Sequence, residues 1–446
     1  MNNTSQLAKD PVHILLFKFS TPAIIAMLAN ALYNVCDRIF VGRGVGTLGI
    51  SAITAAYPIS LIIIAFSMLV GIGAVSLVSI KLGEQNINEA ELVLGNTFTL
   101  SVIVSIVLTF LGYIFIDPVL NVFGGKGEVL IYSKEYTNIF LLSTLFQILG
   151  FSMNSILRGQ GNAKKAMQNM LAGIILNIIF NPIFIFMFNM GIKGSALATV
   201  LSITITSICA TYSFLSKKST LKLYVKNLKL KKHILFKILS IGVSAFLMQL
   251  AMCLITIVFN KRFEIYGGNI SLATYGIINS LFMLIFMPIN GIIQGVQPII
   301  GYNYGFKNFK RVKKALNISL ISVTIISIIG FLILELFSDN IIRIFSISNS
   351  KLITIGSHAI KICASMIPFV GIQILGSNYF QFIGKAKHSI ILCTLRQVIL
   401  LIPLIIILPI FLKLDGIWLS IPISDFISSI ITIVLLFKEV KNLSNK

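Results

Sequence analysis

The stretch that divides this chain is residues 216–237, SKKSTLKLYVKNLKLKKHILFK, which is rich in lysine and contains no acidic residue. It is the longest polar interruption in 446 residues, of which 56% are hydrophobic and 11% are charged. Soluble domains carry about 25% charged residues. Apolar runs recur on both sides of the interruption, and each can cross a bilayer core of roughly 30 Å as a helix. The sequence therefore predicts an all-α, polytopic membrane protein.

Charged or Gly/Pro-marked breaks separate the apolar runs into twelve expected transmembrane helices. In the first half these are 15–41, 50–80, 93–116, 134–157, 166–189 and 194–215. In the second half they are 235–260, 271–300, 314–337, 354–383, 388–411 and 415–437. We therefore predict an N-terminal six-helix lobe over residues 1–215, a cytoplasmic Lys-rich linker over 216–234 and a C-terminal six-helix lobe over 235–446.

The net charge of +22 is unevenly distributed over the expected loops. With the N-terminus placed inside, 25 of the 36 Lys and Arg residues fall on the inner side of the membrane. This bias follows the positive-inside rule and predicts a multi-pass plasma-membrane protein with both termini in the cytoplasm. The partner of so apolar a chain is the lipid bilayer, and we expect it to bind no nucleic acid. The five cysteines stand singly, which favours neither a disulfide framework nor a metal site.

The two halves repeat one another. GIGAVSLVSIKLG (71–83) corresponds to GIIQGVQPIIGYNYG (291–305), and ILRGQGNAKKA (156–166) corresponds to YFQFIGKAKHS (379–389). Internal repeats are typical of secondary transporters, whose binding sites lie where the repeats meet. Because each half has six spans, both halves have the same orientation. The expected lobes are thus pseudo-symmetric about an axis along the membrane normal.

Over essentially its whole length the chain resembles the multidrug and toxic compound extrusion (MATE) family. The resemblance rests on LYNVCDRIFVGRGVGTLGISAITAAYP (32–58), RGQGNAKKA (158–166), LNIIFNPIF (176–184), GVQPIIGYNYG (295–305) and GKAKHSIILCTLRQ (384–397). It implies a bacterial two-lobed antiporter that exchanges an inward proton or sodium ion for an outgoing organic cation or drug. No enzyme activity and no cofactor besides the coupling ion are expected, and we expect the chain to act as a monomer.

Asp37 is the one acidic residue well inside a first-half span, and an ionisable residue there is by default a functional hypothesis. Asn30, Tyr33 and Asn34 share its helical face, so this face is predicted to line a cavity. The resemblance implies an essential aspartate at the matching place. The alternative is that Asp37 lies near the outer interface and pairs with a neighbouring arginine.

Asn177 and Asn181 are one helical turn apart, and Pro182 follows, which frees a backbone carbonyl. In relatives the matching pattern is often Asn-x-x-x-Asp-Pro, with a threonine 18 residues later, here Thr199. The resemblance thus implies an ion-coupling site for H⁺ or Na⁺ at Asp37, Asn34, Asn177, Asn181 and Thr199. For Na⁺, the hard oxygen ligands would come from Asp37, Asn177, Asn181 and Thr199. Asn181 replaces an acid, so one formal charge of that site is missing. Hydrogen bonding between helices is the alternative.

Polar stripes mark the second half as well. One contains Gln249, Cys253, Thr256 and Asn260, and the next span mixes amides with Met and Phe. Such faces suit a cavity for varied flat cations, although packing between helices is the alternative. The predicted substrate cavity comprises Asn30, Tyr33, Gln249, Asn279, Met283, Phe286, Asn290 and Asp425. Asp425 is also a secondary candidate for ion binding.

Two other functions are alternatives for a chain of this kind. A lipid-linked saccharide flippase of the wider superfamily would require a strongly cationic cavity, whereas few Lys or Arg residues lie in the middle of a span. A membrane-embedded prenyl transferase would require clustered acids such as D-D-x-x-D, which the sequence does not contain. There is no G-x-x-x-x-G-K-[ST] motif either, so nothing indicates ATP-driven transport.

Overall fold

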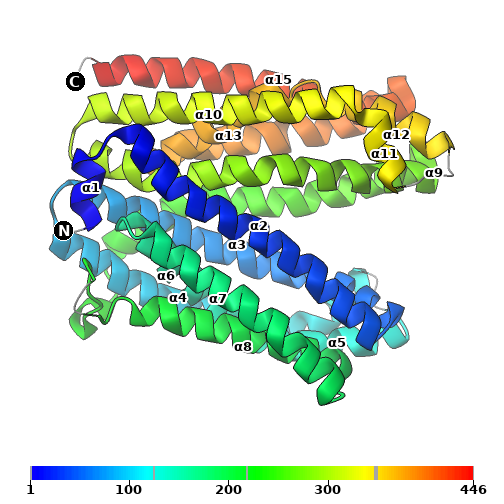
Figure 1. Cartoon of the computed structure of the whole chain (residues 1–446), viewed down its shortest axis with the longest axis horizontal. Coiled ribbons are helices and arrows are strands. Elements are labelled where there is room, and N and C mark those ends of the chain that lie inside the picture. The colour runs from blue at the N-terminus through cyan, green and yellow to red at the C-terminus, as the bar shows by residue number, and fades with distance from the viewer. Residues whose placement is uncertain (1–2, 124–125, 217–218, 346–349, 445–446) are drawn as a thin grey trace.

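The computed structural model describes residues 3–123, 126–216, 219–345 and 350–444. Within these ranges every regular element is helical (Figure 1). Lys217, Lys218 and Lys446, which contribute to the inner-side charge, lie outside them. Backbone polar groups must bond within their own segment in lipid, and the helix is the element that achieves this.

The first half contains six spanning segments after the short α1 (Asn3–Lys9). Two of them contain an irregular turn. The fourth contains the 3₁₀ turn η1 (Leu141–Ser143), and the fifth contains the π-helical turn η2 (Ile183–Met187). The segments are α2 (Val12–Gly44), α3 (Thr47–Gly83), α4 (Ile87–Val122), α5 (Glu128–Phe140) continuing into α6 (Thr144–Gly159), α7 (Ala163–Pro182) with η2, and α8 (Gly191–Tyr212).

The second half begins with α9 (Lys232–Gly305), which the non-helical backbone of Gly268 (φ 61°) divides into Lys232–Gly268 and Ile270–Gly305. Next come α10 (Phe309–Leu336) and the short α11 (Ser338–Phe345). A 47° bend joins α12 (Ser350–Ala364) to α13 (Ile367–Phe382) as one broken span. The last elements are α14 (Ala386–Thr394), the π turn η4 (Leu395–Leu401) and α15 (Ile402–Ser444), which is non-helical at Lys413.

With these breaks, the described ranges contain six spanning segments in each half, which confirms the predicted twelve-helix fold. The helices extend a few residues beyond the predicted apolar runs. α4, for example, begins at Ile87 because the Asn86 side chain accepts a hydrogen bond from the Glu89 N–H (3.0 Å). A side-chain cap satisfies an N–H group that lacks a partner in the first helical turn, so the helix can start in a polar segment.

The internal repeat is visible in the turns. Gln85 and Lys307 both have positive φ (60° and 59°), and each precedes an asparagine that caps the next helix, Asn86 or Asn308. The turn between the fourth and fifth spans has Gly161 (φ 92°) in the first half and Gly384 (φ 76°) in the second. The two halves therefore have turns of the same backbone conformation at equivalent positions.

The linker is fastened to the first half through the buried side chain of Asn96 on α4. Its amide nitrogen donates to the carbonyls of Asn227 (3.1 Å) and Lys229 (3.2 Å). Its amide oxygen accepts from the N–H of Lys231 (2.7 Å). One side chain thus satisfies three backbone groups of the linker just before α9 begins.

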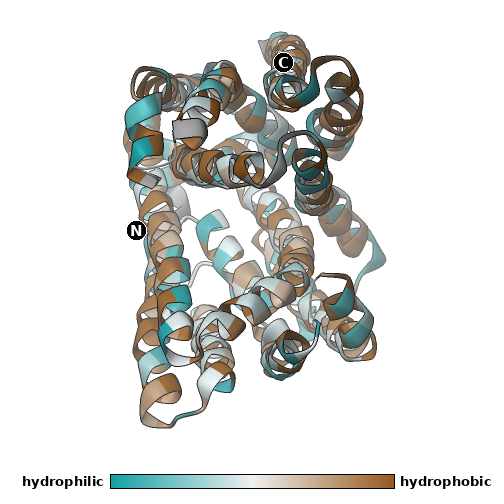
Figure 2. Ribbon diagram, turned by 90° about the vertical axis from the view of Figure 1, so that its right-hand side faces the viewer, coloured by the Kyte–Doolittle hydropathy of each residue, from teal (hydrophilic) through white to brown (hydrophobic). Residues whose placement is uncertain are grey.

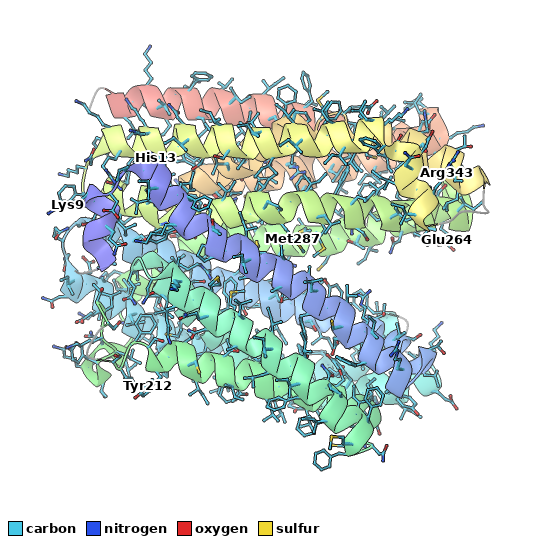
Figure 3. All side chains as sticks on the ribbon, viewed as in Figure 1. Lys9, His13, Tyr212, Glu264, Met287 and Arg343 are labelled. Atoms are coloured by element: carbon cyan, nitrogen blue, oxygen red, sulfur yellow. The ribbon has the colours of Figure 1, made fainter. Side chains whose placement is uncertain are left out.

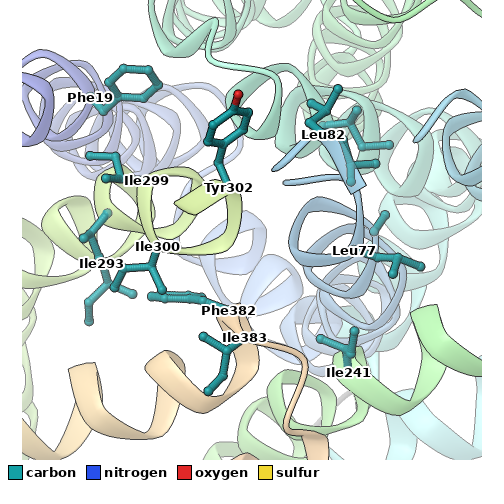
Figure 4. Packing of buried hydrophobic residues seen from close by; sticks show 14 of the residues in the cluster. Phe19, Leu77, Leu82, Ile241, Ile293, Ile299, Ile300, Tyr302, Phe382 and Ile383 are labelled. Atoms are coloured by element: carbon teal, nitrogen blue, oxygen red, sulfur yellow. The ribbon is translucent and has the colours of Figure 1, made fainter. Parts of the chain in front are cut away.

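The two halves are joined at one end of the molecule, which we call the terminal end because both chain termini lie there (Figure 1). Seen from the opposite end, the helices form an upper and a lower group (Figure 2). At the terminal end a single apolar cluster contains residues of both halves, among them Phe19, Leu77, Ile241 and Ile300 (Figure 4). Farther away, each half has a cluster of its own.

Glycines allow α3 and α9 to touch backbone to backbone at the terminal end. A Cβ atom on Gly83 would overlap the carbonyl oxygen of Tyr302, and one on Gly305 would overlap that of Ile80. A second close crossing joins α3 to the first segment of α9. There Gly73 of α3 and Gly242 of α9 each pack against the backbone of the opposite helix. In lipid, close packing of small residues is a main source of helix association.

We predict that Gly83→Ala destabilises the protein by about 1–3 kcal/mol, because the added methyl group meets backbone and forces the helices apart. The measurement is the thermal unfolding temperature of the purified protein. The matched control is Gly276→Ala, also inside a spanning helix, where a Cβ would meet nothing within 4 Å. Equal unfolding temperatures for both variants would contradict the proposed role of this crossing.

Candidate functional site

Asp37 lies on α2 with its side chain buried (8% exposed). Its Oδ1 accepts a hydrogen bond from the Asn181 amide nitrogen (3.0 Å) and one from the Ser195 hydroxyl (3.3 Å). These donors come from α7 and α8, so the carboxylate joins three helices. Among the described residues it forms no ion pair with an arginine or lysine within 4.0 Å. The expected alternative, pairing with a neighbouring arginine, is therefore not what the structure shows.

The hydrogen-bonded network continues along α7 and α8. Asn181 donates to the amide oxygen of Asn177 (2.5 Å), and Asn177 donates to the Thr199 hydroxyl (3.2 Å). All three side chains are buried. Pro182 and the π turn that follows interrupt the regular α-helix here, and π turns often occur at functional sites. The structure thus brings together four of the five residues predicted for ion coupling.

Two further residues belong to this network and were not predicted. The Ser195 hydroxyl donates directly to the Asp37 carboxylate. The side chain of Tyr136 on α5 interacts with that of Thr199, and so does the side chain of Tyr33 on α2. Ser195 is one helical turn before Thr199, so the i, i+4 spacing could have identified it. Tyr136 comes from a different span, and no sequence pattern indicates its position.

Asn34, the fifth residue predicted for ion coupling, lies outside this network. Its side chain is exposed, and its amide donates to the backbone oxygen of Asn30 one turn earlier (2.8 Å). Asn30 is exposed as well, whereas Tyr33 is half-buried. The helical face that the sequence presents as one stripe is therefore divided between a buried end at Asp37 and an exposed end.

The network offers oxygen atoms to a small cation. The amide oxygen of Asn181 is buried and has no hydrogen-bond partner, although the amide nitrogen of the same side chain donates to Asp37. A buried acceptor without a donor is costly unless something occupies it. The carboxylate, amide and hydroxyl oxygens of this network are hard ligands, the kind that small cations prefer.

The predicted residues of the second half all lie on α9 or α15. α9 packs against both α2 and α3, so part of this long helix lies where the halves meet. Asn279 and Met283 are exposed, and Gln249, Phe286 and Asn290 are partly buried. Nearer the terminal end the same stripe joins the halves, because Gln297 donates to the Ser76 hydroxyl (3.1 Å). Figure 3 labels Met287 on this helix, with Lys9 and His13 at the terminal end and Glu264 at the other.

Asp425 is buried in the second half and forms an ion pair with Arg396, whose Nε lies 2.7 Å from its Oδ1. The Ser424 hydroxyl donates to the Arg396 carbonyl (2.7 Å). Arg396 is on the π turn η4, so each half places a buried carboxylate near an irregular helical turn. Asp425 has a cationic partner, however, whereas Asp37 has only neutral donors.

Two matched six-helix lobes, closely packed at one end and holding a buried polar network, define a multi-pass membrane transporter. The MatE family model matches residues 22–183 and 241–407. The chain therefore belongs to the MatE family of multidrug efflux transporters, which are not enzymes.

Individual relatives agree with this assignment. The chain is 27% identical to the multidrug export protein MepA of Staphylococcus haemolyticus over 419 residues, which are 94% of this chain and 92% of the relative. An outward-facing multidrug resistance MATE transporter of the MOP superfamily superposes with a TM-score of 0.92 at 25% identity, covering 99% of this chain and 98% of that one. A MOP superfamily transporter from Pyrococcus furiosus gives the same TM-score at 26% identity and the same coverage, and the reversed polarity of its pocket suggests a different function.

We predict that Asn181→Ala lowers the free energy of unfolding by about 1–3 kcal/mol, because Asp37 and Asn177 both lose a buried donor. Asn34→Ala serves as the control, because its amide is exposed and bonds only within α2; its change should be within about 0.5 kcal/mol. Thermal unfolding in one detergent measures both. An Asn181→Ala protein as stable as the Asn34→Ala protein would show that the network contributes nothing.

Proposed function

We propose that this protein exports organic cations or drugs from a bacterial cell by alternating access, in exchange for an inward proton or sodium ion. This proposal rests mainly on the Asp37 carboxylate. It is buried, it accepts hydrogen bonds from neutral donors, and it has no cationic partner among the described residues. A carboxylate buried in this way gains stability from binding a monovalent cation. Binding would therefore favour one arrangement of α2 against α7 and α8 over another.

The positive-inside bias supports placing the terminal end in the cytoplasm of a plasma-membrane protein. The joined end then faces inward, and the conformation described is outward-facing, as in the similar solved transporter.

This orientation predicts that a cysteine introduced at the exposed Lys229 of the linker, in a background without the five native cysteines, is labelled only by a membrane-permeant maleimide in intact cells. A cysteine at the exposed Glu264 is the matched control, and an impermeant reagent should label it. The reverse labelling pattern would place the termini outside.

The substrate class is inferred from the surface between the halves. Spans one, two, seven and eight meet there, and the predicted cavity residues on α2 and α9 are amides, a tyrosine, a methionine and a phenylalanine. Aromatic faces attract organic cations, and methionine adapts to different shapes. Asp37 of α2 is buried, and among the described residues it has no cationic partner within 4.0 Å.

The energetics restrict the exchange. If one ion enters for each monovalent cation that leaves, no net charge crosses the membrane, and the membrane potential contributes nothing. The concentration gradient of the ion must then drive export, and each tenfold gradient supplies about 1.4 kcal/mol. For a 1:1 antiporter, the substrate concentration ratio across the membrane therefore cannot exceed the concentration ratio of the coupling ion.

The test is efflux of a cationic dye such as ethidium from proteoliposomes under separately imposed pH and sodium gradients. We expect the wild-type protein to respond to at least one gradient, and Asp37→Asn to reduce that response at least tenfold because it cannot change its charge. Asp425→Asn is the comparison, and we expect a smaller loss because Asp425 is already ion-paired. Gradient-driven efflux that survives Asp37→Asn would exclude Asp37 from coupling.

A further inference from the structure

The linker between the halves runs down one side of α4 at the terminal end (Figure 1). Near the start of that helix, the Glu91 carboxylate accepts a hydrogen bond from the Lys222 N–H (3.1 Å). Farther along, the Thr99 hydroxyl donates to the Leu228 carbonyl (2.8 Å). The linker therefore descends along α4 by about 12 Å, because each helical residue contributes a rise of about 1.5 Å. We call residues 222–231 of the linker the strap.

The strap covers the beginning of a helical face that continues as a lipid-facing surface. Asn96, Thr99 and Ile103 follow one another at i, i+3 and i+7, so they share one face of α4. The strap bonds to Asn96 and Thr99, whereas Ile103, Ile106 and Phe110 are 43%, 62% and 66% exposed. Exposed apolar side chains of a spanning helix lie against acyl chains. The strap thus ends where the hydrocarbon region begins, at the level of the lipid headgroups.

The strap is held by its backbone. A Cβ atom at Gly95 would lie 2.4 Å from the carbonyl oxygen of Asn227, so glycine is needed for the strap to pack this closely on α4. The bonds from Glu91, Asn96 and Thr99 also go to backbone groups of the strap. Its position is therefore fixed without the use of its lysine side chains, which stay exposed.

Apolar side chains of the strap are exposed beside these lysines. Val225, the first residue of the 3₁₀ turn η3 (Val225–Leu228), is 84% exposed, and Tyr224 is 40% exposed. The Lys226 Nζ lies 5.3 Å from the centre of the Tyr224 ring. Tyrosine is typical of the membrane interface, and lysine there places its stem along apolar surface and its charge among headgroups.

The positive charge of the strap is not neutralised by the protein. Among the described residues, no lysine of the strap forms an ion pair within 4.0 Å. Of the nearest acidic residues, Glu91 is buried and bonds to the strap backbone, and Glu89 is paired with Lys81 (3.0 Å). The exposed lysines are Lys222, Lys226, Lys229 and Lys231.

We propose that the strap binds the headgroups of anionic phospholipids such as phosphatidylglycerol. The lysines contact the phosphates, while Val225 and Tyr224 enter the interface between headgroups and acyl chains. Lysines close to a membrane surface attract anionic lipids. A lipid fits better than a soluble anion because the most exposed residue of the strap is apolar and lies beside the lipid-facing surface of α4. The proposal does not depend on which ion or drug the protein transports.

The experiment is thermal unfolding of the purified full-length protein in detergent micelles containing either phosphatidylglycerol or phosphatidylcholine at equal mole fraction. Phosphatidylglycerol should raise the unfolding temperature by about 3 °C or more over phosphatidylcholine and reach a plateau, as for a ligand that binds the folded state. Equal unfolding temperatures in the two lipids would overturn the proposal. So would an equal rise with glycerol phosphate, which has the headgroup chemistry without acyl chains.

A triple variant locates the effect on the strap. Replacing three of its exposed lysines by glutamine should leave the fold intact, because the strap is held by backbone bonds. We expect the apparent affinity for phosphatidylglycerol to fall about tenfold or more, since each lysine near an anionic surface contributes several-fold. An unchanged affinity would refute the site. The variant is Lys222→Gln, Lys226→Gln and Lys229→Gln.

The matched control removes three exposed lysines of the same end from the turn before α10 and from its first turns. It changes the net charge equally and should keep at least half of the affinity for phosphatidylglycerol. Glutamine suits the positive φ of Lys307 because Gln85 has the same conformation in the first half. A loss equal to that of the strap variant would show a response to total charge and would overturn the proposal. The control is Lys307→Gln, Lys310→Gln and Lys314→Gln.

The depth of the strap is tested with a spin label on Val225→Cys in liposomes, in the background without the five native cysteines. Molecular oxygen, which concentrates in acyl chains, should relax this label more than a water-soluble nickel complex does. A label on Asn88→Cys, an exposed position in the first turn of α4, is the control and should respond mainly to nickel. Equal nickel accessibility at both positions would place the strap in water and contradict its binding to lipid.

Discussion

The contact on which the rest of this structure depends is the backbone-to-backbone packing of α3 against α9. Gly83 and Gly305 each sit against a carbonyl of the opposite helix, so the halves approach more closely than side chains would allow. Lipid gives helices little hydrophobic reason to associate, and such packing supplies the attraction instead. Because these contacts lie at the terminal end, they fix a closed end and leave the other ends of the lobes with separate cores.

The lobes share their turns and helix order but differ in how they neutralise charge. Asp425 is paired with Arg396, whereas Asp37 has only amide and hydroxyl donors. At another equivalent pair of positions, three residues before Gly161 and Gly384, Arg158 has no acidic residue within 4.0 Å among the described residues, while Gln381 is neutral and hydrogen-bonded. The first half therefore carries both of these buried charges without an ion pair.

The fold alone does not determine what is transported. A MOP superfamily transporter of nearly the same fold has a pocket of reversed polarity, which suggests a different function for that protein. Function depends on the charges placed on a shared scaffold. The hydrogen-bond donors to Asp37 in this chain, Asn181 and Ser195, are both neutral, so the described network contains a single carboxylate.

The sequence by itself determined the number of helices, their order and the two-lobe repeat, because spans in lipid must be long, apolar and internally hydrogen-bonded. It also indicated Asp37 and Asn181, since polar residues are conspicuous in an apolar run. It could not reveal that Ser195 donates to Asp37 or that Arg158 has no acidic residue within 4.0 Å among the described residues. Those facts depend on which helices face one another, and helix rotation and pairing are decided by packing over the whole molecule.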